Sequence, residues 1–332
     1  MRVVAGKHRG RKLLQFSGND IRPTSDRAKE GVFSVLQFEI AGKRFLDGFC
    51  GSGAMGIEAL SRGAREVVFT DCSKSSCELT KKNLEMLGEN AKVIKTDLIE
   101  FLKRTDEKFD IIFLDPPYKS DAGVKALEII AKRQILNDKG IAIIESGSVI
   151  NQSIDGLFVE KRKKYGIAEF AFYKKTDNDL CVFAGSFDPV TAGHVHIVEK
   201  AKEQYKRVIV LLAVNDSKVY TFSKHKRLQM LNAAFEDSDR VTVTSYDGYL
   251  VDFLKQNNTV NNIRGIRNQS DMQYEEDMLA VNKTMFPEIR NVYIYADQNL
   301  MHVSSTWVKE QLKAGKSAYD LLPEKVAKVL DN

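Results

Sequence analysis

The stretch GSFDPVTAGHVHIV, at residues 185–198, has the residue types of a phosphate-binding turn. Glycine, aspartate and proline at its start predict a tight turn after a strand, and the segment from Thr191 to His194 predicts the beginning of a helix. Backbone N–H groups at a helix N-terminus favour a bound phosphate. His194 would add a donor where negative charge builds in a phosphoryl-transfer transition state. His196 is expected to point elsewhere and is interpreted as non-catalytic.

Three further segments of this half have side chains that suit phosphate. Lys218 follows the second expected strand, and Arg264 and Arg267 lie at the end of the fourth. Three hydroxyl residues stand at 304–306, before another expected helix. Ligands of open α/β sheets bind at the carboxyl ends of strands, so these groups are expected to meet His194 at one edge of a sheet. A plain helix N-cap is the alternative interpretation of residues 304–306.

A second glycine-rich turn lies in the first half, where FLDGFCGSGAMGIEAL has three glycines in G-x-G-x-x-G spacing between an expected strand and an expected helix. This spacing is shared by proteins that bind nicotinamide, flavin and methyl-donor cofactors. Asp71 could accept hydrogen bonds from ribose hydroxyls, and Asp97 could accept one from an adenine amine. A tight turn with two exposed acids is the alternative. The candidate cofactor-binding residues are Asp47, Gly51, Gly53, Gly56, Asp71 and Asp97.

The sequence Asp115-Pro116-Pro117-Tyr118 favours methyl transfer to an amine. Two consecutive prolines cannot donate to a sheet ladder, so the segment is predicted to be a rigid loop after a buried strand. The Asp115 carboxylate and the Pro116 carbonyl would then be two fixed acceptors for the exocyclic amine of a nucleobase. Tyr118 would stack on the base, which must leave its own stack to reach the site. Catalysis would be mostly positioning.

The elements that must position these residues alternate between strand and helix twice over. This alternation predicts two tandem α/β domains, each with a doubly wound, mostly parallel sheet. The polar segment 174–180 is predicted to link a first domain, 1–176, to a second, 180–332. Residues 170–175 are predicted to close the first sheet as an antiparallel edge strand. The other predicted strands are 44–49, 66–71, 92–97, 109–115 and 140–146 in the first half, and 181–187, 207–215, 241–246, 261–266 and 291–296 in the second.

The composition is that of a soluble globular protein, with 332 residues, 43% hydrophobic and 29% charged. There is no apolar run of the roughly 18 residues that a spanning helix needs, and no segment like a signal peptide. We therefore expect a cytoplasmic protein without a membrane partner. The four cysteines have no C-x-x-C spacing, which predicts reduced thiols and no protein-held metal.

Positive charge is concentrated at the N-terminus. Residues 1–30 contain eight Lys or Arg and three acids, so this segment has the whole net charge of +5 and the rest of the chain is neutral. A basic arm of this kind suits a phosphate backbone, because binding releases counterions from the nucleic acid. A solvated basic edge is the alternative.

Three further segments, GKHRGRKL, IRPTSDRAKEGVFSVL and GIEALSRGA, make residues 1–176 resemble the bacterial guanine-N2 methyltransferases of small-subunit ribosomal RNA. That resemblance implies S-adenosylmethionine as methyl donor and rRNA, or an assembling subunit, as partner. Gly48 and Cys50 depart from the usual pattern of that family but leave the glycines of the turn in place. The residues implied to place the RNA or the base are Arg22, Thr24, Asp26 and Arg27.

Residues 180–332 resemble phosphopantetheine adenylyltransferase, of the T/H-x-G-H nucleotidyltransferase superfamily, over their full length. The resemblance rests on the G-S-F-D-P-V-T-x-G-H motif, on serine and lysine at 217–218, on IRGIRNQSDMQYE, and on S-S-T before a tryptophan. It implies adenylyl transfer from ATP, with Mg²⁺, to 4′-phosphopantetheine, with His194 and Lys218 in catalytic roles. The implied phosphopantetheine contacts are Ser186, Lys218, Leu250 and Arg264. The implied ATP contacts are Ser186, Phe187, His194, Gly265, Ile266, Arg267, Glu275, Leu300, Met301, His302, Val303, Ser304, Ser305 and Thr306.

The second half also departs from that family in places. None of the departures removes His194, Lys218 or either arginine, so activity is expected and ATP affinity is the property most open to change. The family is typically hexameric, which implies a homo-oligomer formed through this domain. The departing positions are Ala184, Ala192, Val219, Leu300, His302 and the basic run 223–227.

Each half has alternatives. The first half could be an RNA-binding module without methylation, or could methylate an adenine or a protein amide. The second could be another nucleotidyltransferase, acting on nicotinate mononucleotide or glycerol phosphate, or could bind nucleotide without turnover. The IRGIRNQSDMQYE run favours phosphopantetheine, and the basic arm together with RPTSDR favours guanine in RNA.

Overall fold

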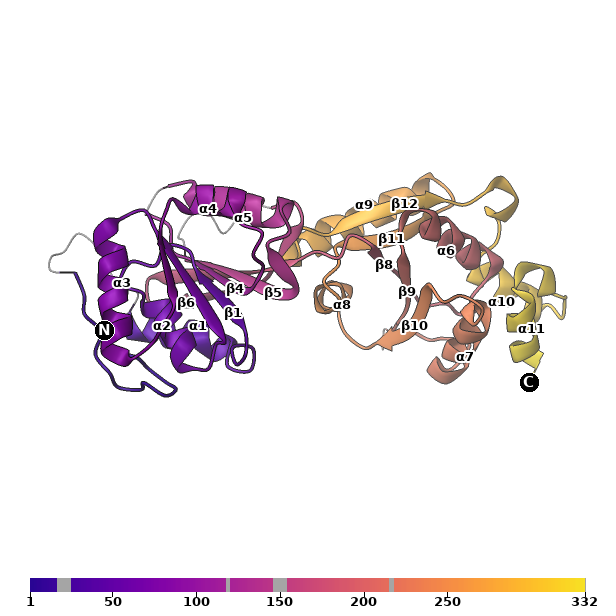
Figure 1. Ribbon diagram of the computed structural model, residues 1–332. Coiled ribbons are helices and arrows are strands. Elements are labelled where there is room, and N and C mark those ends of the chain that lie inside the picture. Colours follow the sequence, from indigo (N-terminus) through magenta and orange to yellow (C-terminus); the bar gives the residue numbers. More distant parts are fainter. Residues whose placement is uncertain (17–24, 118–119, 146–153, 215–217, 332) are drawn as a thin grey trace. The chain divides into compact units, whose positions relative to one another are not determined.

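The computed structural model describes every residue except 17–24, 118–119, 146–153, 215–217 and 332 (Figure 1). The chain divides into two compact units, Met1–Lys175 (unit 1) and Thr176–Asn332 (unit 2). Each unit has its own sheet and its own hydrophobic core. The prediction of two tandem α/β domains with mostly parallel sheets is confirmed.

The described part of unit 1 forms a seven-stranded sheet in the order β3-β2-β1-β4-β5-β7-β6. Strands β1 to β5 are parallel, and β7 and β6 are antiparallel additions. The strands are β1 (Arg44–Asp47), β2 (Glu66–Asp71), β3 (Lys92–Lys95), β4 (Phe109–Leu114), β5 (Leu136–Glu145), β6 (Leu157–Tyr165) and β7 (Ala168–Lys175). The helices are α1 (Asp26–Val35), α2 (Ala54–Ser61), α3 (Lys74–Leu87), α4 (Leu98–Arg104) and α5 (Ala122–Lys132).

Helices cover both faces of this sheet, which is why the middle residues of its central strands are apolar. In β4, Ile111 and Phe113 pack on the side of α1, α2 and α3, whereas Ile112 and Leu114 pack on the side of α4 and α5 (Figure 1). A parallel strand buried on both faces reads as a continuous hydrophobic run, as IIFL at 111–114 does. The two cores hold the carboxyl ends of the parallel strands at one edge.

Two expectations about the end of unit 1 were wrong. Strand β7 is antiparallel as predicted, but it lies between β5 and β6, and β6 is the edge strand. The run EKRKK at 160–164 hides β6 from a search for apolar alternation, because an edge strand keeps charged side chains that discourage pairing with other chains. The linker is also shorter than predicted, because β7 ends at Lys175 and the next strand begins at Leu180.

Unit 2 contains a five-stranded parallel sheet in the order β10-β9-β8-β11-β12. Helices α6, α7, α10 and α11 pack on one face, around Val198, Leu212 and Met230. The strands are β8 (Leu180–Gly185), β9 (Arg207–Ala213), β10 (Val241–Tyr246), β11 (Asn261–Ile266) and β12 (Arg290–Tyr295). The helices are α6 (Ala192–Gln204), α7 (Lys224–Phe235), α8 (Leu250–Gln256), α9 (Gln269–Met285), α10 (Ser305–Lys313) and α11 (Glu324–Asp331), with short 3-10 turns at Gln298–Leu300 and Tyr319–Leu321.

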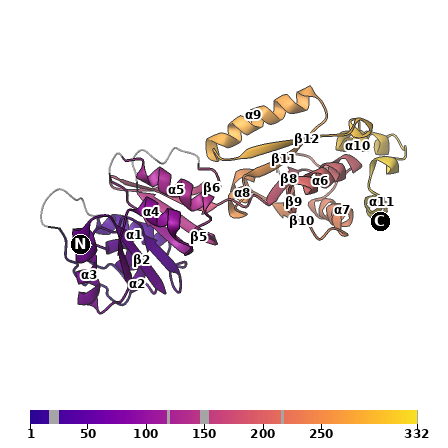
Figure 2. The ribbon, with the colours of Figure 1, turned by 45° about the horizontal axis from the view of Figure 1, so that its top comes forward.

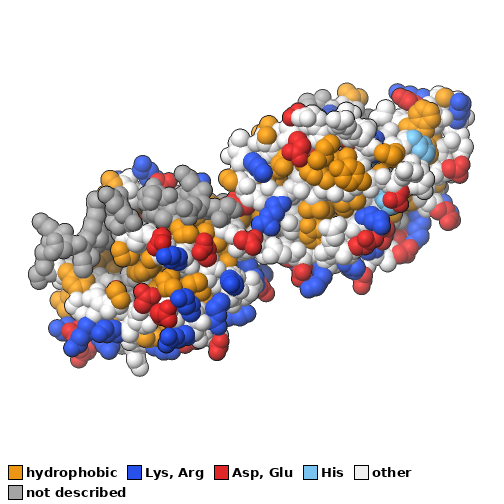
Figure 3. Space-filling model, turned by 90° about the horizontal axis from the view of Figure 1, so that it is seen from above, with side chains coloured by type: hydrophobic (Ala, Val, Ile, Leu, Met, Phe, Trp, Pro, Cys, Tyr) orange, Lys and Arg blue, Asp and Glu red, His pale blue; other side chains and the backbone are white. Residues whose placement is uncertain are grey.

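Helix α9 differs from the other long helices because none of its residues is buried. Figure 2 shows this helix at the top of unit 2. Tyr274, Met278, Val281 and Met285 are exposed and recur at the spacing of one helical face. Hydrophobic side chains gather on this side of unit 2 in the view of Figure 3. None of the helices in the described part of the chain has the length and apolar character required to cross a bilayer.

Candidate active sites

Unit 2 has a cavity of about 510 Å³ at the carboxyl ends of β8 and β11. The sheet order reverses there, between the first strand of the unit and the fourth, which is where open α/β sheets bind ligands. Ile266, Met301 and His302 are not among the described residues of its lining. The predicted residues that do line it are Ser186, Phe187, His194, Lys218, Leu250, Arg264, Gly265, Arg267, Glu275, Leu300, Val303, Ser304, Ser305 and Thr306.

His194 is held in one tautomer. The backbone N–H of Thr191, the N-cap of α6, donates to Nδ1 of His194 over 3.0 Å. A backbone N–H can only donate, so Nδ1 has no proton and the proton of the neutral ring is on Nε2. Burial and the nearby charge of Arg267 lower the pKa of His194 to about 4. His194 is therefore a neutral Nε2–H donor at physiological pH.

Asp188 joins the turn to the segment that contains Lys218. Its buried carboxylate accepts hydrogen bonds of 2.9 Å from the backbone N–H groups of Thr221 and Phe222, and it pairs with Lys309 of α10 at 3.2 Å. Burial would raise the pKa of Asp188, but these partners outweigh it and lower the pKa. Asp188 thus fixes the path of the chain just after Lys218.

Arg227 supports the same turn from the side of α7. Its buried guanidinium donates to the carbonyl oxygen of Ser186 over 2.8 Å, and it lies over the ring of Tyr220, 3.8 Å from the ring centroid. The hydroxyl of Ser305 donates to the carbonyl oxygen of Pro189 over 2.8 Å. The turn is therefore held by side chains from α7 and α10.

The two predicted arginines are both paired. Arg264 donates to both carboxylate oxygens of Glu275, in α9, and to the carbonyl oxygen of Ala184. Arg267 pairs with Asp271 at 2.8 Å. Glu275, which the family resemblance implies as an ATP contact, thus lies in the cavity wall as the partner of Arg264.

Of the three hydroxyl residues at 304–306, one is a helix N-cap, which is the alternative interpretation of this segment. Ser304 is the N-cap of α10, and its hydroxyl accepts from the N–H of Trp307 over 3.0 Å. Ser304 and Thr306 also line the cavity. His196 is close to Asp297, at 3.5 Å, and is not among the described lining residues.

Sequence reasoning assigned no role to several residues of the cavity wall. Phe183, Tyr220 and Tyr274 are the aromatic ones; Tyr274 lies within the IRGIRNQSDMQYE run, and the other two lie close to recognised motifs. In the sequence each of them is only an aromatic residue in or near a motif, and such a residue could equally line the site or pack in the hydrophobic core. Ile197, Ala213 and Ala296 also line the cavity and have no chemical signature.

In unit 1 three carboxylates converge at the carboxyl ends of adjacent strands. Asp47, the last residue of β1, pairs in register with Phe69 of β2 and Phe113 of β4. Asp71 and Asp115 lie two residues beyond those partners. Asp47 is buried, and burial, together with the charges of Asp115 and Asp71, raises its pKa to about 7. The glycine turn and the Asp-Pro-Pro loop therefore meet at one edge of the sheet.

The glycine turn needs its glycines for two different reasons. Gly51 and Gly53 have positive φ angles of 53° and 78°, which disfavour other residues, and Gly53 is the N-cap of α2. At Gly56 a Cβ would lie 2.2 Å from the ring of Phe69, so close packing excludes a side chain. The N–H of Gly56 donates to Asp47, and that of Gly51 to Asp71, at 2.9 and 3.0 Å.

The remaining predicted residues of unit 1 differ in burial, and some lie outside the described part of the chain. Asp97 is exposed and is the N-cap of α4, where it accepts from the N–H of Glu100. Asp115 is half-buried and Pro116 is buried. Asp26 pairs with Arg2, and Arg27 is exposed. The predicted residues that lie outside the described residues are Arg22, Thr24 and Tyr118.

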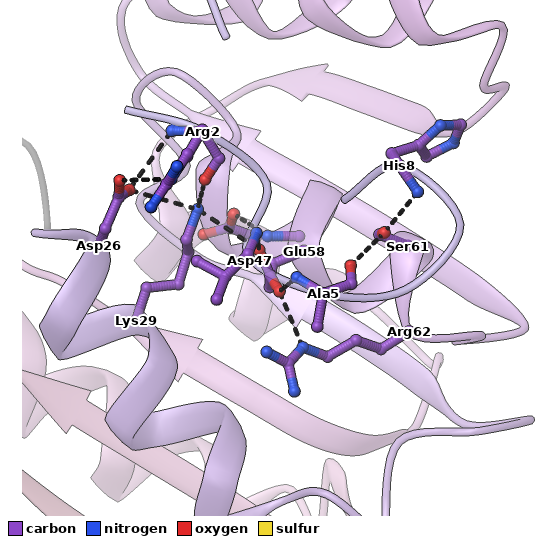
Figure 4. Close-up of polar contacts among 11 residues, drawn as sticks. Arg2, Ala5, His8, Asp26, Lys29, Asp47, Glu58, Ser61 and Arg62 are labelled. Carbon is purple, nitrogen blue, oxygen red and sulfur yellow. Dashed lines mark hydrogen bonds and ion pairs between the residues drawn. The ribbon is translucent and has the colours of Figure 1, made fainter. Parts of the chain in front are cut away.

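The first residues of the chain are held by polar contacts with side chains of α1 and α2 (Figure 4). Glu58 of α2, fully buried, accepts from the N–H groups of Val4 and Ala5 and pairs with Arg62. Lys29, also fully buried, donates to the carbonyl of Arg2 and lies 3.4 Å from Glu58. The basic side chains of this arm are exposed: Arg2, Lys7, Arg9, Arg11 and Lys12.

The two sheets and their sites define an α/β chain of two tandem Rossmann-like enzymes, a methyltransferase followed by a nucleotidyltransferase. Residues 1–174, just over half of the chain, match the family model described as conserved hypothetical protein 95. Residues 182–311 match the cytidylyltransferase-like family model. The chain belongs to the conserved hypothetical protein 95 family in its first half and to the phosphopantetheine adenylyltransferase family in its second.

Individual relatives agree with this division. Phosphopantetheine adenylyltransferase of Dictyoglomus turgidum is 40% identical over 149 residues, which is 45% of this chain and 93% of the relative. The enzyme of the same name from Leptospira biflexa is 33% identical over 151 residues, 46% of this chain and 94% of the relative. Ribosomal RNA small subunit methyltransferase D of Haemophilus influenzae is 38% identical over 151 residues, 44% of this chain and 78% of the relative.

Proposed function

We propose that this chain is a bifunctional enzyme that works in the cytoplasm. Unit 2 would transfer an adenylyl group from ATP to 4′-phosphopantetheine, and unit 1 would methylate a guanine N2 of small-subunit rRNA. The adenylyltransferase rests on the cavity that brings His194, Lys218, Arg264 and Arg267 together, in a chain similar to proteins named phosphopantetheine adenylyltransferase. The methyltransferase rests on the meeting of the glycine turn with Asp115, in a chain similar to an rRNA methyltransferase.

In unit 2 the chemistry is a direct displacement at phosphorus. A phosphate oxygen of 4′-phosphopantetheine attacks the α-phosphorus of ATP, and the bond from that phosphorus to the β,γ-diphosphate breaks. The products are dephospho-coenzyme A and pyrophosphate. The attacking phosphate is already an anion, so no general base is required. The Nε2–H of His194 and the charges of Lys218 and Arg267 would stabilise the negative charge in the transition state.

Mg²⁺ would enter this site on ATP and neutralise the departing pyrophosphate. Among the described residues there is no group of three or more His, Cys, Asp or Glu that could hold a metal ion. That fits Mg²⁺, which is usually held by substrate phosphates with few protein carboxylates.

In unit 1 the glycine turn would bind S-adenosylmethionine, which supplies the methyl group. Asp71 accepts from the N–H of Gly51, yet a carboxylate oxygen has a second lone pair that a ribose hydroxyl could use. The Asp115 carboxylate and the Pro116 carbonyl would accept the two N–H donors of the guanine amine and orient it toward the methyl group. The exposed cations of residues 1–12 would contact the RNA backbone.

We also propose that the protein self-associates through unit 2. The support is α9, a helix of 17 residues with no buried residue and with an exposed apolar face. A contiguous apolar face on a folded unit is typical of a protein interface. A homo-oligomer would bury this face.

The methyltransferase is tested with labelled S-adenosylmethionine and unmodified small-subunit rRNA or subunits, followed by identification of the labelled nucleoside. N2-methylguanosine is expected, and it should be lost in Asp115→Ala but kept in His194→Ala. Label in adenine, or no label, would overturn the assignment to guanine N2.

The adenylyltransferase is tested by pyrophosphate release from ATP with 4′-phosphopantetheine as acceptor. Release should be lost in His194→Ala and kept in Asp115→Ala. Release with nicotinate mononucleotide or glycerol phosphate but not with 4′-phosphopantetheine would assign a different nucleotidyltransferase. ATP binding without any release would leave unit 2 as a nucleotide-binding module.

A further inference from the structure

Asn83, in α3, contacts both the N-terminal arm and the glycine turn of unit 1. We call residues 1–16 the arm. The side-chain oxygen of Asn83 accepts a hydrogen bond from the backbone N–H of Leu14 over 2.7 Å. Its side-chain nitrogen donates to the carbonyl of Leu14 over 3.1 Å and to the carbonyl of Ser52 over 2.9 Å. Leu14 belongs to the arm and Ser52 to the glycine turn, so one amide group joins the two.

The orientation of this amide follows from its partners. The N–H of Leu14 can only donate, so the atom that faces it is the oxygen, and the two carbonyls must face the NH₂ group. Asn83 is fully buried, so water does not replace these contacts. The amide is planar and rigid, and a displacement of Ser52 is therefore passed to Leu14.

Two other side chains of the same helical region contact only one of these two segments each. One turn before Asn83, the hydroxyl of Thr80 donates to the carbonyl of Gly51 over 3.1 Å, within the glycine turn. Just after the helix, Glu89 pairs with Lys7 at 2.7 Å and contacts His8, both in the arm. Thr80 and Glu89 are therefore matched controls, the first for the turn and the second for the arm.

We propose that Asn83 is a positioning residue that couples methyl-donor binding to RNA binding. The inference rests on the proposed methyltransferase function, because it assigns the donor to the glycine turn and the RNA backbone to the arm. Binding of the donor fixes the backbone around Ser52, Asn83 then fixes the backbone at Leu14, and the arm is set for RNA. Coupling is reciprocal, so RNA must strengthen donor binding by the same factor.

The experiment measures this factor in the full-length protein. The donor probe is S-adenosylhomocysteine, the demethylated donor, which binds without turnover, and the RNA probe is small-subunit rRNA transcribed in vitro. The Kd of each is measured with and without the other at one fixed salt concentration, because RNA affinity depends on salt. In the unaltered protein we expect each ligand to lower the Kd of the other by at least about 5-fold.

The variants separate coupling from folding. In Asn83→Ala the factor should fall to about 1, while each ligand still binds alone. Thr80→Val should weaken only the S-adenosylhomocysteine affinity. Glu89→Gln removes the carboxylate that pairs with Lys7 and should raise only the RNA affinity. Both variants should keep the coupling factor. An unchanged factor in Asn83→Ala, or no coupling in the unaltered protein, would overturn the proposal. Failure of either probe to bind the unaltered protein would instead contradict the proposed methyltransferase function.

A second measurement needs no variant. Hydrogen exchange of the arm peptide that contains Leu14 is followed in the unaltered protein, with and without S-adenosylhomocysteine. The Leu14 amide is the one that Asn83 accepts from, so donor binding should slow its exchange. Exchange that does not change when S-adenosylhomocysteine is bound would also contradict the coupling.

Discussion

At the scale of single residues, His194 shows how a backbone contact decides a chemical role. The motif predicts a histidine at the beginning of a helix, but it does not say which ring nitrogen has the proton. The N–H of Thr191 donates to Nδ1, so the proton of the neutral ring is on Nε2. Burial of the ring, together with the nearby charge of Arg267, also lowers the pKa of His194 to about 4.

This pKa leads to a prediction about pH. An unfolded histidine titrates near 6.5, whereas His194 in the folded protein should titrate near 4. The folded state binds fewer protons between these values, so the contribution of His194 to stability rises with pH from about 4 to 6.5 and is complete above that. The measurement is the NMR titration of its ring, assigned with His194→Ala. A midpoint near 6.5 would contradict the lowered pKa.

For Asp47 the dependence of folding stability on pH has the opposite sign. Its pKa is raised from 3.8 unfolded to about 7 folded, so the folded state keeps a proton that the unfolded state has lost. The ionised carboxylate therefore destabilises unit 1 increasingly from pH 4 to pH 7. Asn could still accept from the N–H of Gly56, so Asp47→Asn should stabilise unit 1 at pH 8 by a few kcal/mol and change little at pH 4.

Hydrogen exchange of residues 44–61 in the full-length protein would measure this effect at both pH values. The same stabilisation at pH 4 and pH 8 would show that burial of charge is not its cause. Asp47→Asn should also lower the affinity for S-adenosylhomocysteine if the carboxylate itself contacts the donor.

At the scale of elements, the predictions that succeeded depend on local pattern. Short apolar runs separated by helical periods predicted the parallel strands of both sheets. Strand β6 was missed because its charged residues face outward at a sheet edge, where no apolar period is required. Glycine and proline motifs placed the ends of β1, β4 and β8 within two residues of where they lie, because the backbone itself requires those residue types there.

The pairing of β11 with α9 leads to another prediction. Glu275 holds the guanidinium of Arg264 from α9, so Glu275→Gln should release Arg264 from its fixed position. We expect the KM for 4′-phosphopantetheine to rise severalfold with little change in the KM for ATP. A selective rise in the KM for ATP would show that Glu275 contacts the nucleotide itself, as the family resemblance implies. The measurement is steady-state kinetics of pyrophosphate release.

At the scale of the whole molecule, the parts that could not be predicted are the long-range contacts. Asn83 joins Leu14, 69 residues earlier in the chain, to Ser52, and Asp188 accepts from N–H groups more than 30 residues later. Nothing in the local sequence of either residue indicates its partner, because an asparagine or aspartate has the same chemistry at a solvated surface. Such contacts depend on the completed fold, whereas the residues that we propose as substrate contacts lie in recognisable motifs.

The unburied helix α9 leads to the prediction that concerns the whole protein. Met278 and Val281 lie on its apolar face, and placing a charge at each would put two carboxylates into any interface formed there. The double variant Met278→Glu, Val281→Glu should therefore sediment as a smaller species than the unaltered protein. Both residues are exposed in the single chain, so its folded state should keep its stability.

A matched control lies on the same helix. Lys283 is also exposed, and at about 100° per residue it lies roughly opposite the apolar face, so Lys283→Glu should leave the sedimentation of the protein unchanged. If all three proteins sediment alike as monomers, α9 does not mediate self-association and its apolar face needs another occupant. If they sediment alike as the same oligomer, the interface lies elsewhere on the chain. Loss of the oligomer in the double variant alone would place the interface on α9, because the control changes charge on the same helix without touching that face.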